Sequence, residues 1–188
     1  MRVIVGISGA SGAIYGWRLL ERLRSQQSAE IHLIMTRSGE KTLFLETGKT
    51  AADVHQLADF WYSDADIGCR LASGSFQTGA MAIAPCSIHT MSAIAHGISS
   101  NLMVRAADVI LKERRKLVLM IRETPLHLGH LRTMTLLAEM GAVIAPPVPG
   151  FYHNPQTVTE LVDHSVDRTL DLIGLPDPGV RRWEGMSK

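Results

Sequence analysis

The stretch VGISGASGAIYG, from Val5 to Gly16, places four glycines and two serines in twelve residues at the end of a short apolar run. An apolar run that passes through glycines into a segment of helical period predicts a β-strand, a tight turn and an α-helix. The spacing G-x-x-G-x-x-G-x-x-x-G differs from the dinucleotide fingerprint, and no Gly-Lys-Ser or Gly-Lys-Thr follows as in a P-loop. The next predicted strand leads into Met35-Thr36-Arg37-Ser38, without the Asp or Glu that would bind an NAD ribose, so the sequence disfavours NAD.

This glycine turn has two interpretations. In one, the backbone N–H groups at the start of the helix and the hydroxyls of Ser8 and Ser11 bind an anion or the polar edge of a ring. In the other, the glycines only allow a tight turn and no ligand is bound. The rest of the chain has to decide between them.

Outward from this turn, short apolar runs alternate with longer segments of helical period. Strands are predicted at Arg2–Ile7, Ile31–Met35, Met81–Ala84, Lys116–Ile121 and Ala142–Ala145, and helices at Ala13–Leu23, Gly39–Glu46, Ala51–Phe60, Thr90–His96, Leu102–Glu113, Leu128–Met140 and Gln156–Ile173. This alternation predicts an α/β fold of three layers, in which helices cover a mostly parallel sheet of flavodoxin-like or Rossmann-like type. We expect residues 1–188 to form a single domain with an irregular carboxyl-terminal tail from about residue 175.

The overall composition limits the classes of function. The 188-residue chain carries 19 Lys and Arg against 18 Asp and Glu, which gives no general affinity for nucleic acid or for a membrane surface. No segment reaches the roughly 18 consecutive apolar residues of a membrane span, and we expect a soluble, cytoplasmic protein. Cys69 and Cys86 are too few for a disulfide framework, and no base is placed beside Cys86 to make it a nucleophile. His127 and His130 lack a third ligand nearby, so we expect no metal.

Residues capable of chemistry follow the ends of the predicted strands. They are Ser8 to Gly12, Thr36 to Ser38, Pro85 to Thr90, Arg122 to Pro125, and Pro146 to Tyr152. Because the carboxyl ends of parallel strands line one crevice, we expect these five segments to converge there. That crevice is the predicted functional site.

The segment Pro85-Cys86-Ser87-Ile88-His89-Thr90 repeats the hydroxyl-rich pattern at the start of another helix. Ser87 can cap this helix and Thr90 lies in its first turn, where a phosphate would also fit. A capping role without a ligand is the alternative. Two such turns in one crevice, together with Thr36 and Ser38, favour a phosphorylated planar cofactor over a simple anion, and FMN is the candidate.

Charged residues mark two further places. Arg105, Asp108 and Lys112 recur at i, i+3 and i+7 in an otherwise apolar helix, and this placement needs an explanation. An ion pair plus a favourable charge at the helix end is the explanation without a ligand, and we accept it for the charges of Glu113 to Lys116 that follow. Arg122 and Glu123 end an apolar strand at the crevice. There, a guanidinium is suited to a phosphate and a carboxylate to proton transfer, and a structural salt bridge is the alternative.

Five motifs together resemble one known family. GISGASGAIYG, PCSIHT with SSN, RAADVILKERRKLVL, RETPLHLGHL and PPVPGFYHNPQ are similar to the UbiX-type flavin prenyltransferases, in order from Arg2 to Trp183. The resemblance implies a large homo-oligomer, a dodecamer, that binds FMN near subunit interfaces. It also implies a metal-independent reaction that joins the dimethylallyl group of dimethylallyl phosphate to N5 of reduced FMN and then to C6. The product, prenylated FMN, would serve a UbiD-type aromatic acid decarboxylase, in ubiquinone biosynthesis or phenolic acid breakdown.

The matching motifs also imply roles for individual residues. The FMN contacts would be Gly9, Ala10, Ser11, Thr36, Ser87, Ile88, His89, Thr90 and Arg122. Dimethylallyl phosphate would be held by Lys112, Arg122, Tyr152 and Arg168, partly across an interface, with Arg105 nearby and Trp183 in the pocket wall. Ser11 and Glu123 would serve proton transfer, and either Glu123 or the departing phosphate would take the proton from C6. The sequence departs from the family pattern at Thr36-Arg37-Ser38-Gly39, where relatives carry Ser-Lys-Ala-Ala. A hydroxyl is nevertheless kept at Thr36.

The sequence leaves two other functions open. One is an FMN-dependent decarboxylase of the phosphopantothenoylcysteine decarboxylase type, which shares the fold, but the sequence lacks the Pro-x-Met-Asn motif of those enzymes. The other is a non-catalytic FMN-binding module, which would not need Glu123 beside an arginine at the site.

Overall fold

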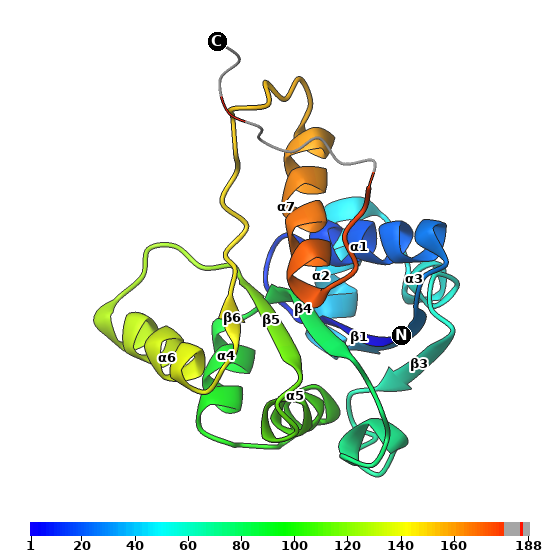
Figure 1. Cartoon of the computed structure of the whole chain (residues 1–188), viewed down its shortest axis with the longest axis vertical. Helices are drawn as coiled ribbons and strands as arrows, with labels where there is room; N and C mark the ends of the chain where they lie inside the picture. Colours follow the sequence, from blue (N-terminus) through cyan, green and yellow to red (C-terminus); the bar gives the residue numbers. More distant parts are fainter. Residues whose placement is uncertain (179–184, 186–188) are drawn as a thin grey trace.

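The computed structural model describes residues 1–178 and 185, and in this part of the chain six parallel strands form one sheet (Figure 1). The strands are β1 (Arg2–Ile7), β2 (Glu30–Met35), β3 (Phe60–Ser63), β4 (Ala80–Cys86), β5 (Lys116–Ile121) and β6 (Val143–Ile144). Their order is β3-β2-β1-β4-β5-β6, and every neighbouring pair is parallel. This is the strand order of a Rossmann-type sheet, whose direction of winding reverses between β1 and β4.

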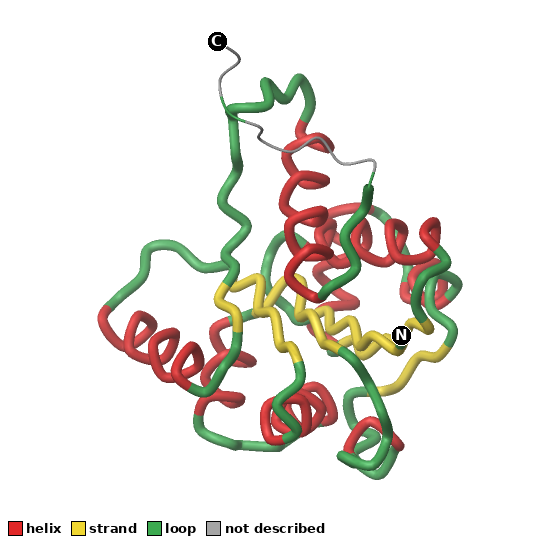
Figure 2. Tube along the Cα trace, in the orientation of Figure 1, coloured by secondary structure: helices red, strands yellow, loops and turns green. Residues whose placement is uncertain are grey.

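Helices cover both faces of the sheet, which confirms the predicted three-layer α/β fold (Figures 1 and 2). The helices are α1 (Ala13–Gln26), α2 (Arg37–Thr47), α3 (Ala51–His55), α4 (Ile88–Ala95), α5 (Leu102–Lys112), α6 (Leu128–Glu139) and α7 (Val158–Ile173), with a 3-10 turn at Arg70–Ala72. Apolar side chains of α1, α2, α3 and α7 form one core cluster with the sheet, and those of α4, α5 and α6 form a second cluster on the other face. Because both faces are covered, the central strands are continuously apolar.

The alternating side chains of β1 show how the two clusters share one strand. Val3 and Val5 belong to the first cluster, whereas Ile4 belongs to the second. All three side chains are buried. In the described residues, no helix has both the length and the apolar composition needed to cross a membrane.

The prediction of a helix from Ala51 to Phe60 is wrong in its second half. Helix α3 begins with a capping box between Thr50 and Asp53 and ends at His55. The Asp59 carboxylate then accepts a hydrogen bond from the backbone N–H of Ile31, 2.7 Å away, which fixes the chain beside β2. The aromatic residues that follow therefore pair with β2 as the edge strand β3. Without β3 the remaining five strands would have the flavodoxin order, and with it the sheet has the Rossmann order.

The other predicted elements are present, and their boundaries differ from the predicted ones by at most three residues. Two of these boundary differences involve residues of the predicted site. Helix α4 begins at Ile88 instead of Thr90, and α2 begins at Arg37 instead of Gly39, because Ser87 and Thr36 are the capping residues.

The segment of residues 146–157, which we call the arm, does not join the crevice as predicted. After β6, the Ala145 N–H donates a last ladder hydrogen bond to the Leu119 carbonyl, 2.9 Å away. Pro146, Pro147 and Pro149 then have no N–H to continue the ladder. The arm instead runs away from the sheet to the amino-terminal end of α7 (Figure 1).

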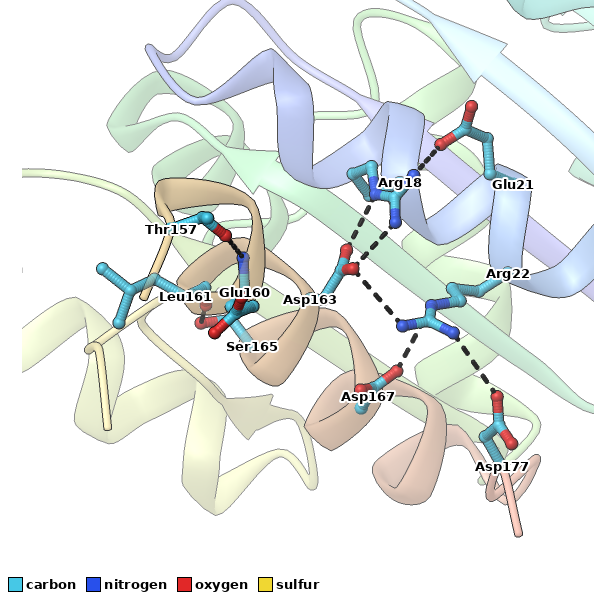
Figure 3. Close-up of polar contacts among 10 residues, drawn as sticks. All are labelled: Arg18, Glu21, Arg22, Thr157, Glu160, Leu161, Asp163, Ser165, Asp167 and Asp177. Carbon is cyan, nitrogen blue, oxygen red and sulfur yellow. Dashed lines mark hydrogen bonds and ion pairs between the residues drawn. The ribbon is translucent and has the colours of Figure 1, made fainter. Parts of the chain in front are cut away.

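A network of ion pairs fixes α7 against α1 (Figure 3). The Arg18 guanidinium donates two hydrogen bonds to the Asp163 carboxylate, 2.7 and 2.8 Å long. Arg22 lies 3.3 Å from Asp163, 3.6 Å from Asp167 and 3.8 Å from Asp177. The side chain of Asp167 is only 11% exposed, and burial raises its pKa above the ordinary value.

This network leads to a prediction about stability. Because the folded pKa of Asp167 is raised, its ionised form disfavours the folded state, and this cost grows as the pH rises from 3.8 through the folded pKa. Asp167→Asn should therefore raise the free energy of unfolding at pH 7, by less than ~1 kcal/mol, and the difference should vanish toward pH 3.8. Urea denaturation at several pH values measures this. As the control, Asp163→Asn should lower stability by about 1–3 kcal/mol, because it removes the paired contact with Arg18.

Candidate functional site

The turn after β1 and the turn after β4 are joined directly at the point where the sheet reverses its winding. The Ser8 hydroxyl donates to the Pro85 carbonyl at 2.7 Å and accepts from the Ser87 N–H at 2.8 Å. The side chain is fully buried. The prediction that the Ser8 hydroxyl faces a ligand is therefore wrong, because both of its hydrogen-bonding roles are taken by the β4 turn.

The turn after β2 packs against the same glycine turn. The Thr36 N–H donates to the Ile7 carbonyl, and the Thr36 hydroxyl accepts from the Gly39 N–H, both at 3.0 Å. At Gly9, an added Cβ would lie 2.4 Å from the Cβ of Ser38, so only glycine allows this close approach. The turns after β1, β2 and β4 thus meet at the carboxyl ends of these strands, which we call the rim. Gly9 and Ser11 are exposed there.

The turn after β4 presents the start of a helix to this rim. Ser87 caps α4, since its hydroxyl accepts from the Thr90 N–H at 3.2 Å and donates to the Thr90 hydroxyl at 3.0 Å. Thr90 is only 4% exposed. The capping role of Ser87 is confirmed, and the capacity of this turn to bind an anion depends on the N–H groups of Ile88 and His89, which have no partner within the helix.

Arg122 and Glu123 follow β5 beside these turns. The Arg122 N–H donates to the Cys86 carbonyl at 3.1 Å, and its guanidinium lies near enough to Tyr15 to favour the phenolate. Burial nevertheless dominates and raises the pKa of Tyr15. Glu123 is exposed, and its Oε1 accepts from the Thr124 N–H at 2.9 Å. Among the described ion pairs, none joins Arg122 to Glu123, so both are available to a ligand.

One carboxylate at the rim was missed by the sequence patterns. Glu46, near the end of α2, accepts hydrogen bonds from the N–H groups of Gly12 and Ala13, each 2.9 Å from its Oε2. It therefore occupies the start of α1, where a ligand anion was expected. In the sequence, Glu46 is an exposed residue of an amphipathic helix, and only the packing of α2 against α1 brings it to the site.

The expected phosphate-binding residues are dispersed within one chain. Lys112 ends α5 near the amino-terminal end of β5, whereas Arg122 follows the carboxyl-terminal end of the same strand. The Lys112 ammonium pairs with Glu113. Arg105 donates to the Ala72 carbonyl at 3.2 Å and pairs with Asp108 at 2.6 Å. Tyr152 lies on the arm, whereas the Arg168 side chain on α7 is 67% exposed. Trp183, expected in the pocket wall, lies outside the described residues.

Two cysteine and histidine features have structural explanations. Burial raises the pKa of the Cys86 thiol to about 12, so a thiolate nucleophile is not available there. The His127 Nδ1 accepts from the N–H groups of Gly129 and His130 and thereby caps α6. Within residues 1–178 and 185, no group of three or more His, Cys, Asp or Glu side chains is arranged to hold a metal ion.

Comparisons with known proteins identify the family of this chain. The model of the family described as Flavoprotein matches residues 1–169. The flavin prenyltransferase UbiX of Escherichia coli K12 is 55% identical over 186 residues, which is 98% of each chain. This chain belongs to the UbiX flavin prenyltransferases.

Solved structures of UbiX proteins have the same fold throughout. The dodecameric FMN-dependent UbiX-like decarboxylase from Escherichia coli O157:H7 matches with a TM-score of 0.96 and 47% identity, covering 98% of this chain and all of the other. AnUbiX in complex with FMN and dimethylallyl pyrophosphate also has a TM-score of 0.96, with 42% identity over 99% of this chain and 98% of its own. The fold, the family and the class of enzyme expected from the sequence are confirmed.

The hydrogen-bond donors at the rim of this UbiX chain suit a flavin mononucleotide. The start of α4 provides N–H groups for a terminal phosphate, and the exposed Ser11 provides a hydroxyl. The glycine turn leaves the backbone accessible to the edge of a flat ring. Arg122 adds a positive charge at the same rim.

Proposed function

We propose that this chain transfers a dimethylallyl group from dimethylallyl phosphate to reduced FMN, first at N5 and then at C6, and so makes prenylated FMN for a UbiD-type decarboxylase. One observation carries this proposal. The turns after β1, β2 and β4 are tied into one rim, and Arg122 follows β5 beside them, where its N–H is bonded to the Cys86 carbonyl. Glu46 and Glu123 bring carboxylates to the same rim.

The residues around the rim have separate tasks in binding FMN. The proposed contacts are Gly9, Ala10, Ser11, Thr36, Ser87, Ile88, His89, Thr90 and Arg122. The start of α4 holds the FMN phosphate, and the glycine turn lies against the ring system. Reduced FMN supplies a nucleophilic N5 and the neighbouring C6.

Several cations and a phenol act on the phosphate ester. A departing phosphate gains negative charge as the bond between its oxygen and the allylic carbon breaks. Preorganised hydrogen-bond donors stabilise this charge most in a site that excludes water. Arg122, Lys112, Tyr152 and Arg168 are the proposed donors, with Arg105 nearby. Glu46 is held rigidly by two N–H groups and places a negative charge where the allylic fragment becomes cationic.

The positions of these donors require more than one subunit. β5 separates Arg122 from Lys112, and six residues of strand span roughly 20 Å. One phosphate cannot contact both in the same chain. We therefore propose a homo-oligomer in which neighbouring subunits complete each site, and the dodecameric relative from Escherichia coli O157:H7 supports an assembly of twelve subunits.

Proton transfer completes the reaction. Ser11 lies in the glycine turn, and Glu123 lies at the end of β5 with one carboxylate oxygen bonded to the Thr124 N–H. Ring closure at C6 adds a proton to the double bond of the transferred group and removes a proton from C6, and Glu123 is the proposed acceptor of the proton lost from C6. The departing phosphate is the second possible acceptor.

The test is direct. The purified protein is incubated without oxygen with reduced FMN and either dimethylallyl phosphate or dimethylallyl diphosphate, and the released flavin is weighed by mass spectrometry. A mass increase of one five-carbon unit with the monophosphate supports the proposal. Unmodified FMN with both esters overturns it, and carbon dioxide release from an aromatic acid by this chain alone would instead favour a decarboxylase.

Sharing of the site between subunits gives a second prediction. Lys112→Ala and Arg122→Ala should each lower the rate of adduct formation by about 10²-fold, because each removes a charged donor to the departing phosphate. Oligomers assembled from both variants together should regain activity, because about a quarter of the sites in a random mixture combine an intact Lys112 with an intact Arg122.

The matched control pairs Arg122→Ala with Glu123→Gln. These two residues lie on the same turn of the same chain, so their mixture should stay inactive. Recovery in the control, or its absence in the Lys112 and Arg122 mixture, would contradict a site shared between subunits.

We also place the protein in the cytoplasm and treat residues 1–188 as a single domain. The unpaired thiols of Cys69 and Cys86 support a reducing compartment. The single sheet with helices on both faces supports one domain.

A further inference from the structure

Tyr152 is held by a cluster of rings that joins the arm (residues 146–157) to α7. Its Oη lies 2.8 Å from the Nε2 of His164, and the two rings meet edge to face with centroids 5.5 Å apart. The ring of His153 stacks on that of His164 with centroids 4.4 Å apart. None of the sequence motifs pointed to His164, which lies in the middle of an amphipathic helix.

The backbone at Gly150 closes over this cluster. A Cβ at this position would lie 2.9 Å from Cε1 of His164 and 3.1 Å from Cε1 of Tyr152. The two rings are therefore packed closely beneath the arm. The position of the phenol depends on the ring beneath it as well as on the arm itself.

The environment of His164 keeps its ring neutral. Burial lowers its pKa, and the neighbouring His153 lowers it further, so the imidazole is neutral near pH 7. Its Nδ1 is buried without a hydrogen-bond partner in the described part of the chain. A neutral imidazole carries one proton. With that proton on Nε2, it donates to the phenol oxygen, and the phenol in turn donates its own proton to an acceptor such as a phosphate oxygen.

We propose that His164 is a positioning residue that orients the Tyr152 phenol toward the phosphate of dimethylallyl phosphate. The chain of donors runs from the imidazole N–H to the phenol oxygen, and from the phenol O–H to the phosphate. Arg168 lies four residues further along α7, on the same face of the helix, and adds its charge to the same anion. This inference rests on the proposed function, since the contact of Tyr152 with the phosphate is part of that proposal.

The test measures binding and turnover separately. Isothermal titration of the protein loaded with oxidised FMN, which does not react, gives the affinity for dimethylallyl phosphate, and mass spectrometry after incubation with reduced FMN gives the rate of adduct formation. Tyr152→Phe should weaken binding of the ester by about 10-fold to 100-fold. His164→Leu should weaken it by about threefold to tenfold, and His164→Gln, which keeps an N–H donor, should stay within ~3-fold of the wild type. The double variant of Tyr152→Phe and His164→Leu should bind no worse than Tyr152→Phe alone.

His153→Phe is the matched control, because it keeps a ring stacked on His164 but removes nitrogens that make no hydrogen bond in the described structure. It should bind the ester as the wild type does. Equal losses in His153→Phe and His164→Leu would show that ring packing alone acts, and wild-type affinity in His164→Leu would show no role; either result overturns the inference while the proposed function stands. A wild-type protein that neither binds the ester nor makes the adduct would overturn the proposed function, and this inference with it.

Discussion

Glu123→Gln is expected to slow formation of the prenylated flavin by about 10²-fold to 10⁴-fold while FMN stays bound. The glutamine keeps a carbonyl oxygen that can accept the hydrogen bond from the Thr124 N–H, so the turn after β5 should keep its conformation. What is lost is the carboxylate that accepts a proton. Stopped-flow or single-turnover assays with mass detection measure the rate, and flavin fluorescence titration measures FMN affinity.

Two comparisons make this result specific. Glu139→Gln makes the same change at an exposed residue at the carboxyl-terminal end of α6, the end that lies away from the turn after β5, and should not alter the rate. An unchanged rate in Glu123→Gln would assign the proton from C6 to the departing phosphate. Loss of FMN affinity in parallel with rate would assign Glu123 to binding and contradict its role in proton transfer.

Gly16→Ala is expected to destabilise the fold by more than ~3 kcal/mol, which is a large part of the stability of a domain of this size. Gly16 lies in the first turns of α1, where a Cβ would be 2.3 Å from the Ala84 carbonyl oxygen and 2.7 Å from Cγ1 of Ile7. A backbone carbonyl of the central strand β4 cannot move aside as the end of a flexible side chain can. The helix would have to shift away from the sheet, and the glycine turn would shift with it.

Denaturation in urea, followed by circular dichroism, measures this loss. Gly68→Ala is the matched control, because the nearest atom to its added Cβ would be Asp66 Oδ1 at 3.9 Å and its backbone is not in the left-handed region. It should change the free energy of unfolding by less than ~0.5 kcal/mol. Equal urea midpoints of unfolding for Gly16→Ala and the wild type would show that α1 can pack on the sheet without this close approach.

Local sequence was enough to predict several parts of the candidate site. Ser87 was expected to cap a helix, and it does, because an N-cap depends only on a hydroxyl and an N–H three residues later. Arg122 and Glu123 were placed at the crevice because they end an apolar strand, and the carboxyl ends of parallel strands lie together on one side of the sheet. The edge strand β3 was missed because its short aromatic run follows a helix directly and carries no clear period.

The sequence by itself determined the alternation of strands and helices, the glycine turn and the helix caps, since each depends on residues close together in the chain. Only the tertiary structure decided that Glu46, and not a ligand, binds the start of α1, and that Ser8 is buried as a link to β4. These outcomes depend on how helices pack against one another and on which strands become neighbours. Such contacts join residues far apart in sequence, and no local period or spacing encodes them.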